Sequence, residues 1–236
     1  MQPKYWNDAT KHLTAACPTL GGVIASYYGE TLISRGDAFH TLARSIAGQQ
    51  ISVKAADSVW VRVVAAASAH VKPSRSKKSR GPVCSTTPEG VLRQKQEEVT
   101  PQAILALTDE ELRACGLSGQ KVKYMRSLAE HFIQNKITET YWDNMTDEEV
   151  IADLTEIKGI GVWTAEMFLI FHLMRPDVYP LADLGLQKAI LKHYPKMKGK
   201  EKDKIKMLKH AKQWKPYRSV ATWYLWRSLD PIPVEY

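Results

Sequence analysis

Apolar residues recur at spacings of three and four along most of this chain, which is the pattern of helices that bury one face. Strand-like alternation of apolar and polar residues is scarce. The segment 121–135 displays the helical pattern clearly. Its apolar stripe consists of Val122, Met125, Leu128, Ala129 and Phe132. The sequence therefore predicts an all-α fold.

Two short motifs predict where helices begin. Thr108–Glu111 and Thr146–Glu149 both read Thr-Asp-Glu-Glu. In such a capping box the Thr hydroxyl and the Glu side chain satisfy each other's free backbone N–H groups. Gly116 and Gly119 bracket a turn ahead of the helix expected over 121–135. These signals divide the middle of the chain into at least three helical segments.

Two stretches are strongly basic. The segment 72–99 interrupts the helical pattern with Pro and Gly, and we interpret it as a flexible, solvated insertion, with auxiliary contact to a polyanionic partner as the alternative. The segment 192–215 holds ten lysines against two acidic residues. It also offers an apolar helix face, so most of these lysines are interpreted as the solvated side and a few as phosphate contacts. That face consists of Ile205, Met207, Leu208 and Ala211.

The composition narrows the class of protein. A chain of 236 residues can form one large domain or two small lobes. Its formal net charge of +8 favours a polyanionic partner, although a merely basic soluble protein fits the charge equally well. No apolar run is long enough to span a membrane, and the N-terminus lacks a signal core, so we expect the protein to stay where it is made. Three dispersed cysteines predict free thiols in a reducing compartment.

A glycine-rich turn precedes an apolar helix. The turn 157–161 reads Ile-Lys-Gly-Ile-Gly, and its glycines allow a tight bend whose backbone N–H groups can meet a phosphate. Trp163 and Thr164 then open the helix. Asp183 follows Gly161 by 22 positions, as a lone carboxylate in an apolar stretch. Taken alone, Asp183 fits a helix N-cap at least as well as an acid aimed at a substrate.

Four blocks of sequence resemble the helix-hairpin-helix (HhH-GPD) superfamily of DNA base-excision glycosylases, and most of all its alkylated-base branch, the 3-methyladenine DNA glycosylase II type. The blocks are 39–52, 111–121, 157–165 followed by Asp183, and 214–226. They occur in the family's order and span nearly the whole chain from residue 38 onward. A Gly-x-Gly turn alone would be weak support, whereas four ordered blocks are strong.

The resemblance implies a two-lobed helical DNA glycosylase fold. A helical barrel lobe over 38–175 would contain the helix-hairpin-helix motif, with 72–99 as an insertion. The second lobe would combine 1–37 with 176–236. We expect the active site, with Asp183, in the cleft between the lobes, where ligand sites are common.

The resemblance also implies a reaction. Breaking an N-glycosidic bond leaves positive charge on the sugar, so Asp183 would stabilise an oxocarbenium-like transition state or activate the attacking water. Bifunctional relatives carry a Schiff-base lysine two residues after the last glycine of the hairpin, and this chain has Trp163 there. We therefore expect hydrolysis alone, which leaves an abasic site.

The base pocket is predicted by the same comparison. Trp163 and Trp226 align with pocket tryptophans of the family and would stack on a cationic alkylated purine. Both could equally be core residues. Met167 stands where alkylpurine enzymes often have a tyrosine, which leaves the substrate range open, and Tyr28, Trp223 and Tyr224 are possible substitutes.

DNA contacts follow from two further motifs. Gln50, with Gln49 and Ile51 beside it, occupies the position of the wedge that fills the gap left by a flipped nucleotide, although an ordinary turn between helices would look the same. The hairpin would bind the DNA backbone. The residues concerned are Lys158, Gly159, Ile160, Gly161 and Thr164.

The resemblance implies a monomer that acts on damaged double-stranded DNA, in the cytoplasm and nucleoid of a bacterium or the nucleus of a eukaryote. It implies no cofactor and no metal held by side chains, although hairpin backbone carbonyls could bind Na⁺ or K⁺. No cysteine follows Cys115, which excludes the four-cysteine iron–sulfur cluster of some relatives. Two alternatives stay open: a glycosylase for hypoxanthine, uracil or oxidised guanine, and a non-catalytic DNA-binding module.

Overall fold

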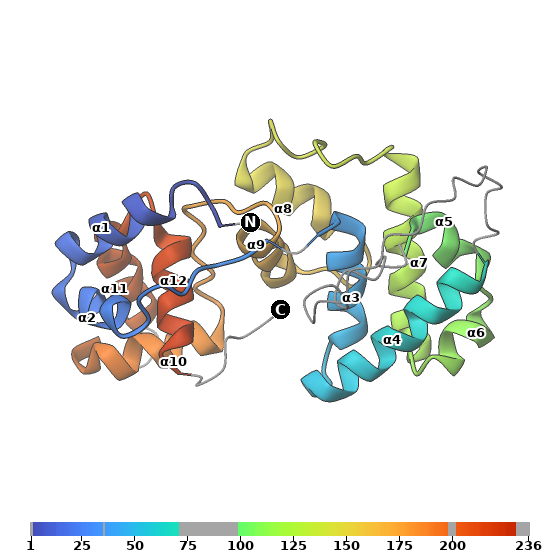
Figure 1. The fold of residues 1–236 in the computed structure, drawn as a ribbon, viewed down its shortest axis with the longest axis horizontal. Coiled ribbons are helices and arrows are strands. Elements are labelled where there is room, and N and C mark those ends of the chain that lie inside the picture. Colours follow the sequence, from blue (N-terminus) through green and yellow to red (C-terminus); the bar gives the residue numbers. More distant parts are fainter. Residues whose placement is uncertain (1, 35, 71–98, 198–201, 230–236) are drawn as a thin grey trace, which may run out of the picture. The chain divides into compact units, whose positions relative to one another are not determined.

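The structure, a computed structural model, describes residues 2–34, 36–70, 99–197 and 202–229 (Figure 1). The regular structure of these residues is helical, and none of them lies in a strand. The predicted all-α class is confirmed. The described residues group into two compact units, each with its own core. The first draws on 1–36, 142–156 and 160–236, and the second on 37–141 and 157–159.

The first unit is built around a helix that is buried on all sides. In α12 every side chain from Ser219 to Trp226 is buried, which identifies it as a central helix rather than a surface one. It contacts α1, α2 and α10, as the dark blue and orange ribbons beside it in Figure 1 illustrate. The helices of this unit are α1 (Trp6–Ala16), α2 (Pro18–Ser26), α8 (Asp147–Thr155), α9 (Val162–Phe171), α10 (Leu184–His193), α11 (Lys202–Ala211) and α12 (Arg218–Arg227), with 3₁₀ turns η2 (Pro195–Met197) and η3 (Lys212–Trp214).

The second unit packs around α7 (Gly119–Gln134), which contacts α3, α5 and α6. Its predicted apolar stripe is buried, which confirms the periodicity. The helix begins two residues earlier than expected, because Ser118 caps it by accepting a hydrogen bond from the Lys121 N–H. The other helices are α3 (Ala38–Gly48), α4 (Val53–His70), α5 (Pro101–Ala106) and α6 (Asp109–Ala114).

Both predicted capping boxes are present. Thr108 and Glu111 exchange hydrogen bonds at the start of α6, and Thr146 and Glu149 do so at the start of α8. Three acidic residues also occupy the first turn of each helix, where the helix dipole favours negative charge. These two helix starts are thus determined by local sequence.

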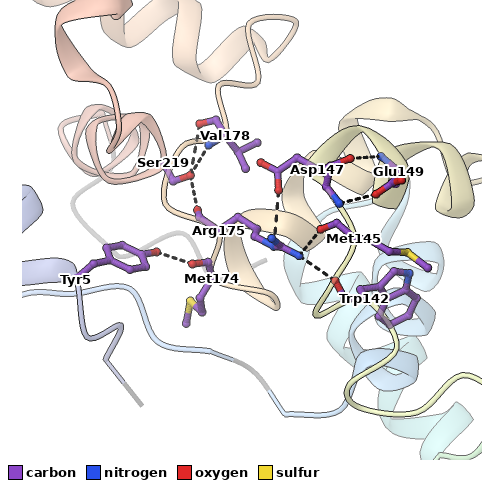
Figure 2. A network of polar contacts seen from close by, with 10 residues as sticks. Tyr5, Trp142, Met145, Asp147, Glu149, Met174, Arg175, Val178 and Ser219 are labelled. Atoms are coloured by element: carbon purple, nitrogen blue, oxygen red, sulfur yellow. Dashed lines mark hydrogen bonds and ion pairs between the residues drawn. The ribbon is translucent and has the colours of Figure 1, made fainter.

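Arg175 organises the chain after α9 (Figure 2). Its guanidinium donates hydrogen bonds of 2.9 Å to the carbonyls of Trp142 and Met145 and lies 3.6 Å from the carboxylate of Asp147. Its own carbonyl accepts a 2.6 Å bond from the Ser219 hydroxyl of α12. One residue therefore joins the loop ahead of α8, the chain after α9 and the central helix, through its side chain and its backbone carbonyl.

Helices α8 and α9 belong to the same compact unit as the N- and C-terminal segments. Phe171 of α9 stacks on Trp226 of α12, with ring centroids 5.9 Å apart, and Phe168 packs on Trp142 at 5.0 Å. The structure thus groups these two helices with the first unit, whereas the resemblance grouped them with residues 38–141. The lobe boundaries expected from the sequence stay a prediction.

The two basic stretches have different outcomes. Residues 72–98 lie outside the described part of the chain, and Val99, the last residue of the predicted insertion, is buried. In α11 only Met207 and Ala211 of the expected apolar face are buried. Ile205 and Leu208 are exposed, whereas Met207 and Ala211, which are spaced by four positions, share the buried side of the helix. Of the four residues of the expected apolar face, two are therefore buried and two are exposed.

Candidate active site

Asp183 begins α10 as its N-cap. Its backbone is extended, and its Oδ1 accepts a 2.5 Å hydrogen bond from the Leu186 N–H. This is the usual geometry of a capping Asp, in which the side chain satisfies a free N–H of the first turn. The structural interpretation of Asp183 as a cap is therefore correct.

The same carboxylate accepts two indole N–H groups. Trp226 Nε1 donates to Oδ1 at 2.8 Å, and Trp163 Nε1 donates to Oδ2 at 3.0 Å. Asp183 is 9% exposed, so this charge is largely removed from water. Gly185 leaves room for the arrangement, because a Cβ there would lie 3.1 Å from Oδ1 and 3.4 Å from the Trp226 ring. The structure thus joins three predicted site residues in one cluster.

The two tryptophans differ in exposure. Trp226 is 5% exposed and stacks on Phe171, so it also belongs to the core. Trp163, in the first turn of α9, is 38% exposed while its N–H is held by Asp183. An indole fixed at its nitrogen and open on part of its ring can stack on a planar ligand.

The other predicted pocket and hairpin residues of the first unit have clear positions. Met167 and Thr164 are buried in α9. Tyr28 is 93% exposed in the turn after α2, and its place in a pocket stays a prediction. Ile160 is buried and Gly161 is exposed, and a Cβ at Gly161 would meet nothing within 4 Å.

One acidic residue near this cluster was missed by sequence reasoning. Glu166 lies in α9, three residues after Trp163, and its Oε2 is buried without a hydrogen-bond partner. Burial, and secondarily the negative charge of Asp183, raise the pKa of Glu166 from 4.5 to about 7. A charged residue in an otherwise apolar helix was the available signal.

In the second unit, three contacts define the start of the glycine turn. The Lys158 N–H donates to the Ser127 hydroxyl at 3.2 Å, and Gln49 Nε2 donates to the Gly159 carbonyl at 2.9 Å. Gly159 has a φ of +90°, and a Cβ there would overlap the ring of Tyr124. Only glycine combines this backbone conformation with this close approach.

The predicted wedge residues occupy the turn between α3 and α4. Gln50 is exposed and has a φ of +59°, which is uncommon for a residue with a side chain. Ile51 beside it is also exposed, whereas Gln49 is bound to Gly159. Such strained positions occur preferentially at functional sites.

Two other features are absent from the described residues. Within these ranges, no group of three or more His, Cys, Asp and Glu side chains could hold a metal ion. No helix in the same part of the chain is long and apolar enough to cross a membrane.

Comparison with known proteins identifies relatives of this chain. The DNA-3-methyladenine glycosylase 1 of Schizosaccharomyces pombe is 32% identical over 209 residues, which cover 87% of this chain and 78% of that protein. The crystal structure of a DNA-3-methyladenine glycosidase from Bacillus halodurans matches with a TM-score of 0.74 and 30% identity, over 94% of this chain and 89% of the other.

A third similar protein has a structure that contains DNA. The 3-methyladenine DNA glycosylase of S. pombe, in complex with abasic DNA, matches with a TM-score of 0.69 and 28% identity, over 97% of this chain and all of that chain. A family model, described as the HhH-GPD superfamily base excision DNA repair protein, matches residues 43–216. This chain belongs to the HhH-GPD superfamily of base excision DNA repair proteins.

Proposed function

We propose that this protein is a monofunctional DNA glycosylase that hydrolyses the N-glycosidic bond of alkylated purines of the 3-methyladenine type in base excision repair. Membership of the HhH-GPD superfamily and the similarity to 3-methyladenine glycosylases support this activity. The observation that carries it is the carboxylate of Asp183, buried and held by the indoles of Trp163 and Trp226.

The chemistry follows from the charge on the substrate. When the bond between C1′ and the base nitrogen breaks, its electron pair goes to the cationic alkylated base, which leaves as a neutral molecule. Positive charge then develops on the sugar, and a carboxylate in a site of low dielectric stabilises it strongly. A water oxygen adds to C1′ and gives up a proton, for which Asp183 is the acceptor. The products are the free base and an abasic site.

The two tryptophans supply base recognition in this proposal. The partly exposed ring of Trp163 stacks on the extruded purine, and the attraction is strongest when the purine is cationic. Trp226 fixes Asp183 from the core side. Met167 and Tyr28 are the proposed remaining pocket residues. Because Trp163 is not a lysine, no Schiff base forms there and the strand is not cut.

Two turns bind DNA in this proposal. The hairpin residues Lys158–Gly161, together with Thr164, bind the phosphate backbone, Lys158 through its exposed side chain and the others through N–H groups. Gln50, flanked by Gln49 and Ile51, enters the duplex where the nucleotide has left. The exposure of Gln50 and its φ of +59° support this assignment.

Three finer features belong to the same proposal. The partner is damaged double-stranded DNA, and the protein acts on it as a monomer. No organic cofactor takes part, and hairpin backbone carbonyls can hold one Na⁺ or K⁺ ion. The protein works in the compartment that holds the chromosome, which is the nucleoid of a bacterium or the nucleus of a eukaryote.

Release of free 3-methyladenine from alkylated duplex DNA tests the proposal, with Asp183→Asn compared to the wild type. Asn also caps helices well, so α10 should persist while the negative charge is lost. We expect the single-turnover rate to fall by a factor of about 100 or more. The matched control is Asp37→Asn, since Asp37 caps α3 in the same way through the His40 N–H.

The outcomes separate capping from chemistry. Near-normal release by Asp37→Asn and strong loss in Asp183→Asn are the expected result. Equal release by both variants would leave Asp183 as a cap only. A panel of duplexes with hypoxanthine, uracil or oxidised guanine tests the alternative specificities, and DNA binding without release of any base would identify a non-catalytic module.

A further inference from the structure

The interior of α9 contains one position that does not fit an apolar helix. From Thr164 to Phe171 every side chain is buried apart from Glu166, which is partly buried. Glu166 follows Trp163 by three residues, and side chains at that spacing share a helix face. Because the Trp163 indole N–H is bound to Asp183, that face is the one directed at the Asp183 cluster.

The carboxyl group of Glu166 lacks a hydrogen bond at one of its oxygens. Its Oε2 is buried and has no hydrogen-bond partner, although buried polar atoms are normally paired. Burial is the larger cause of its raised pKa of about 7, and the charge of Asp183 is the second. The protonated and the ionised form of the group are therefore both populated near neutral pH.

In the described part of the chain, Asp183 is the charged group that raises the pKa of Glu166. The helices around α9 carry other charged groups. They are Asp147, Glu148, Glu149 and Asp153 of α8, Lys188, Lys192 and His193 of α10, Arg218 and Arg227 of α12, and His172 at the end of α9 itself. Asp183 and Glu166 thus belong to one unit, and the charge of Asp183 acts on the carboxyl group of Glu166.

We infer that Glu166 is a second carboxyl group of the active site, and that its loss of a proton strengthens the attraction of the Asp183 cluster for a positive charge. The inference rests on the proposed glycosylase function and adds to it a residue that responds to pH. With the proton in place the pair carries one negative charge, and without it the pair carries two. The positive charge that develops on the sugar is stabilised more strongly by two.

Linkage sets the direction of the pH dependence. A cation beside Asp183 favours the charged form of Glu166, so cation binding expels the Glu166 proton. The affinity for a cation therefore rises as the pH rises toward the pKa of the free group, about 7, and levels off above it. We expect one added negative charge near the bound cation to change the affinity for that cation by about tenfold.

Two abasic duplexes form a matched pair of probes. One contains a pyrrolidine in place of the sugar, which carries an ammonium charge at the reacting position, and the other contains a neutral tetrahydrofuran. The ratio of their affinities isolates the response to charge from DNA binding in general. For the wild type we expect this ratio to rise by about tenfold between pH 5.5 and 8 in favour of pyrrolidine.

Glu166→Gln is the test variant, because it keeps the shape of the side chain and removes the titration. Its ratio should stay at the low-pH value of the wild type throughout. Glu110→Gln, at an exposed position of α6 in the second unit, is the matched control and should behave as the wild type. A pH-dependent ratio that persists in Glu166→Gln would assign the effect to another group and overturn the inference.

A direct titration guards against a folding artefact. The ¹³C carboxyl shift of Glu166 in the DNA-free protein should titrate near pH 7, and at lower pH in Asp183→Asn, because the neighbouring charge is gone. A midpoint near 4.5 in the wild type would overturn the inference. If the protein releases base but its ratio of pyrrolidine to tetrahydrofuran affinity does not change with pH, the role of Glu166 alone is refuted. If the protein releases no base at all, both the proposed function and this inference are refuted.

Discussion

At the scale of single residues, one carboxylate has a structural and a chemical task. Asp183 satisfies the first turn of α10 through Oδ1 and holds the Trp163 indole through Oδ2. A capping residue has its backbone and side-chain positions set by the helix that it starts. The cap therefore orients the acid in advance of substrate binding, which is what electrostatic catalysis requires.

Glu166 adds a pH dependence to the stability of the fold. Its folded-state pKa, about 7, lies above its ordinary value of 4.5, so the folded protein keeps a proton that the unfolded chain gives up. Stability must then fall as the pH rises from about 4.5 to about 7. Glu166→Gln lacks this loss and should gain thermal stability over the wild type between pH 5 and pH 8.

The expected gain in the midpoint is on the order of 2–4 °C, equivalent to about 1 kcal/mol after allowance for partial exposure. Thermal unfolding followed by circular dichroism at the two pH values measures it. An equal difference in unfolding midpoint between variant and wild type at pH 5 and pH 8 would contradict the raised pKa of Glu166. Higher stability together with a weaker response to cations would identify Glu166 as a site residue kept at a cost to the fold.

At the scale of elements, the glycine turn and the helix starts represent two kinds of sequence information. The capping boxes of α6 and α8 are local, so four consecutive residues predict them. The turn at Gly159 also depends on Tyr124 and Gln49, which are distant in sequence. The glycine was recognisable from its motif, but its close contacts were not.

Gly159→Ala should destabilise the protein markedly. The φ of +90° disfavours any side chain, and the new Cβ would overlap the Tyr124 ring. We expect a loss of about 2 kcal/mol or more in the free energy of unfolding, measured by denaturant titration. Gly161→Ala is the control, because its φ is −100° and a Cβ there meets nothing within 4 Å. Equal midpoints for the two variants would refute the proposed constraint.

At the scale of the whole molecule, charge governs the encounter with DNA. A formal net charge of +8 predicts binding that weakens as salt rises, because bound counterions are released from the phosphates. The side chain of Lys158 is exposed, while its backbone N–H is held by Ser127, so its charge can be removed without disturbing the turn.

Lys158→Ala should weaken binding to damaged and undamaged duplexes alike and reduce the slope of log K against log salt by about 1. Fluorescence anisotropy over a series of salt concentrations measures both quantities. Lys11→Ala, on the exposed side of α1, serves as the comparison. A loss confined to the damaged duplex would mean that Lys158 recognises the lesion rather than the backbone.

The sequence by itself determined the helical class, two helix starts, the glycine turn and Asp183 as an acid of interest, because periodicity, caps and tight turns are local properties. It did not determine that the exposed face of α11 includes Ile205 and Leu208, nor that α8 and α9 belong to the same compact unit as the terminal segments. Only the tertiary structure bound Trp163 and Trp226 to Asp183 and brought Glu166 under the influence of its charge. Burial and proximity between residues that are far apart in the chain arise when helices pack, and both raise the pKa of Glu166.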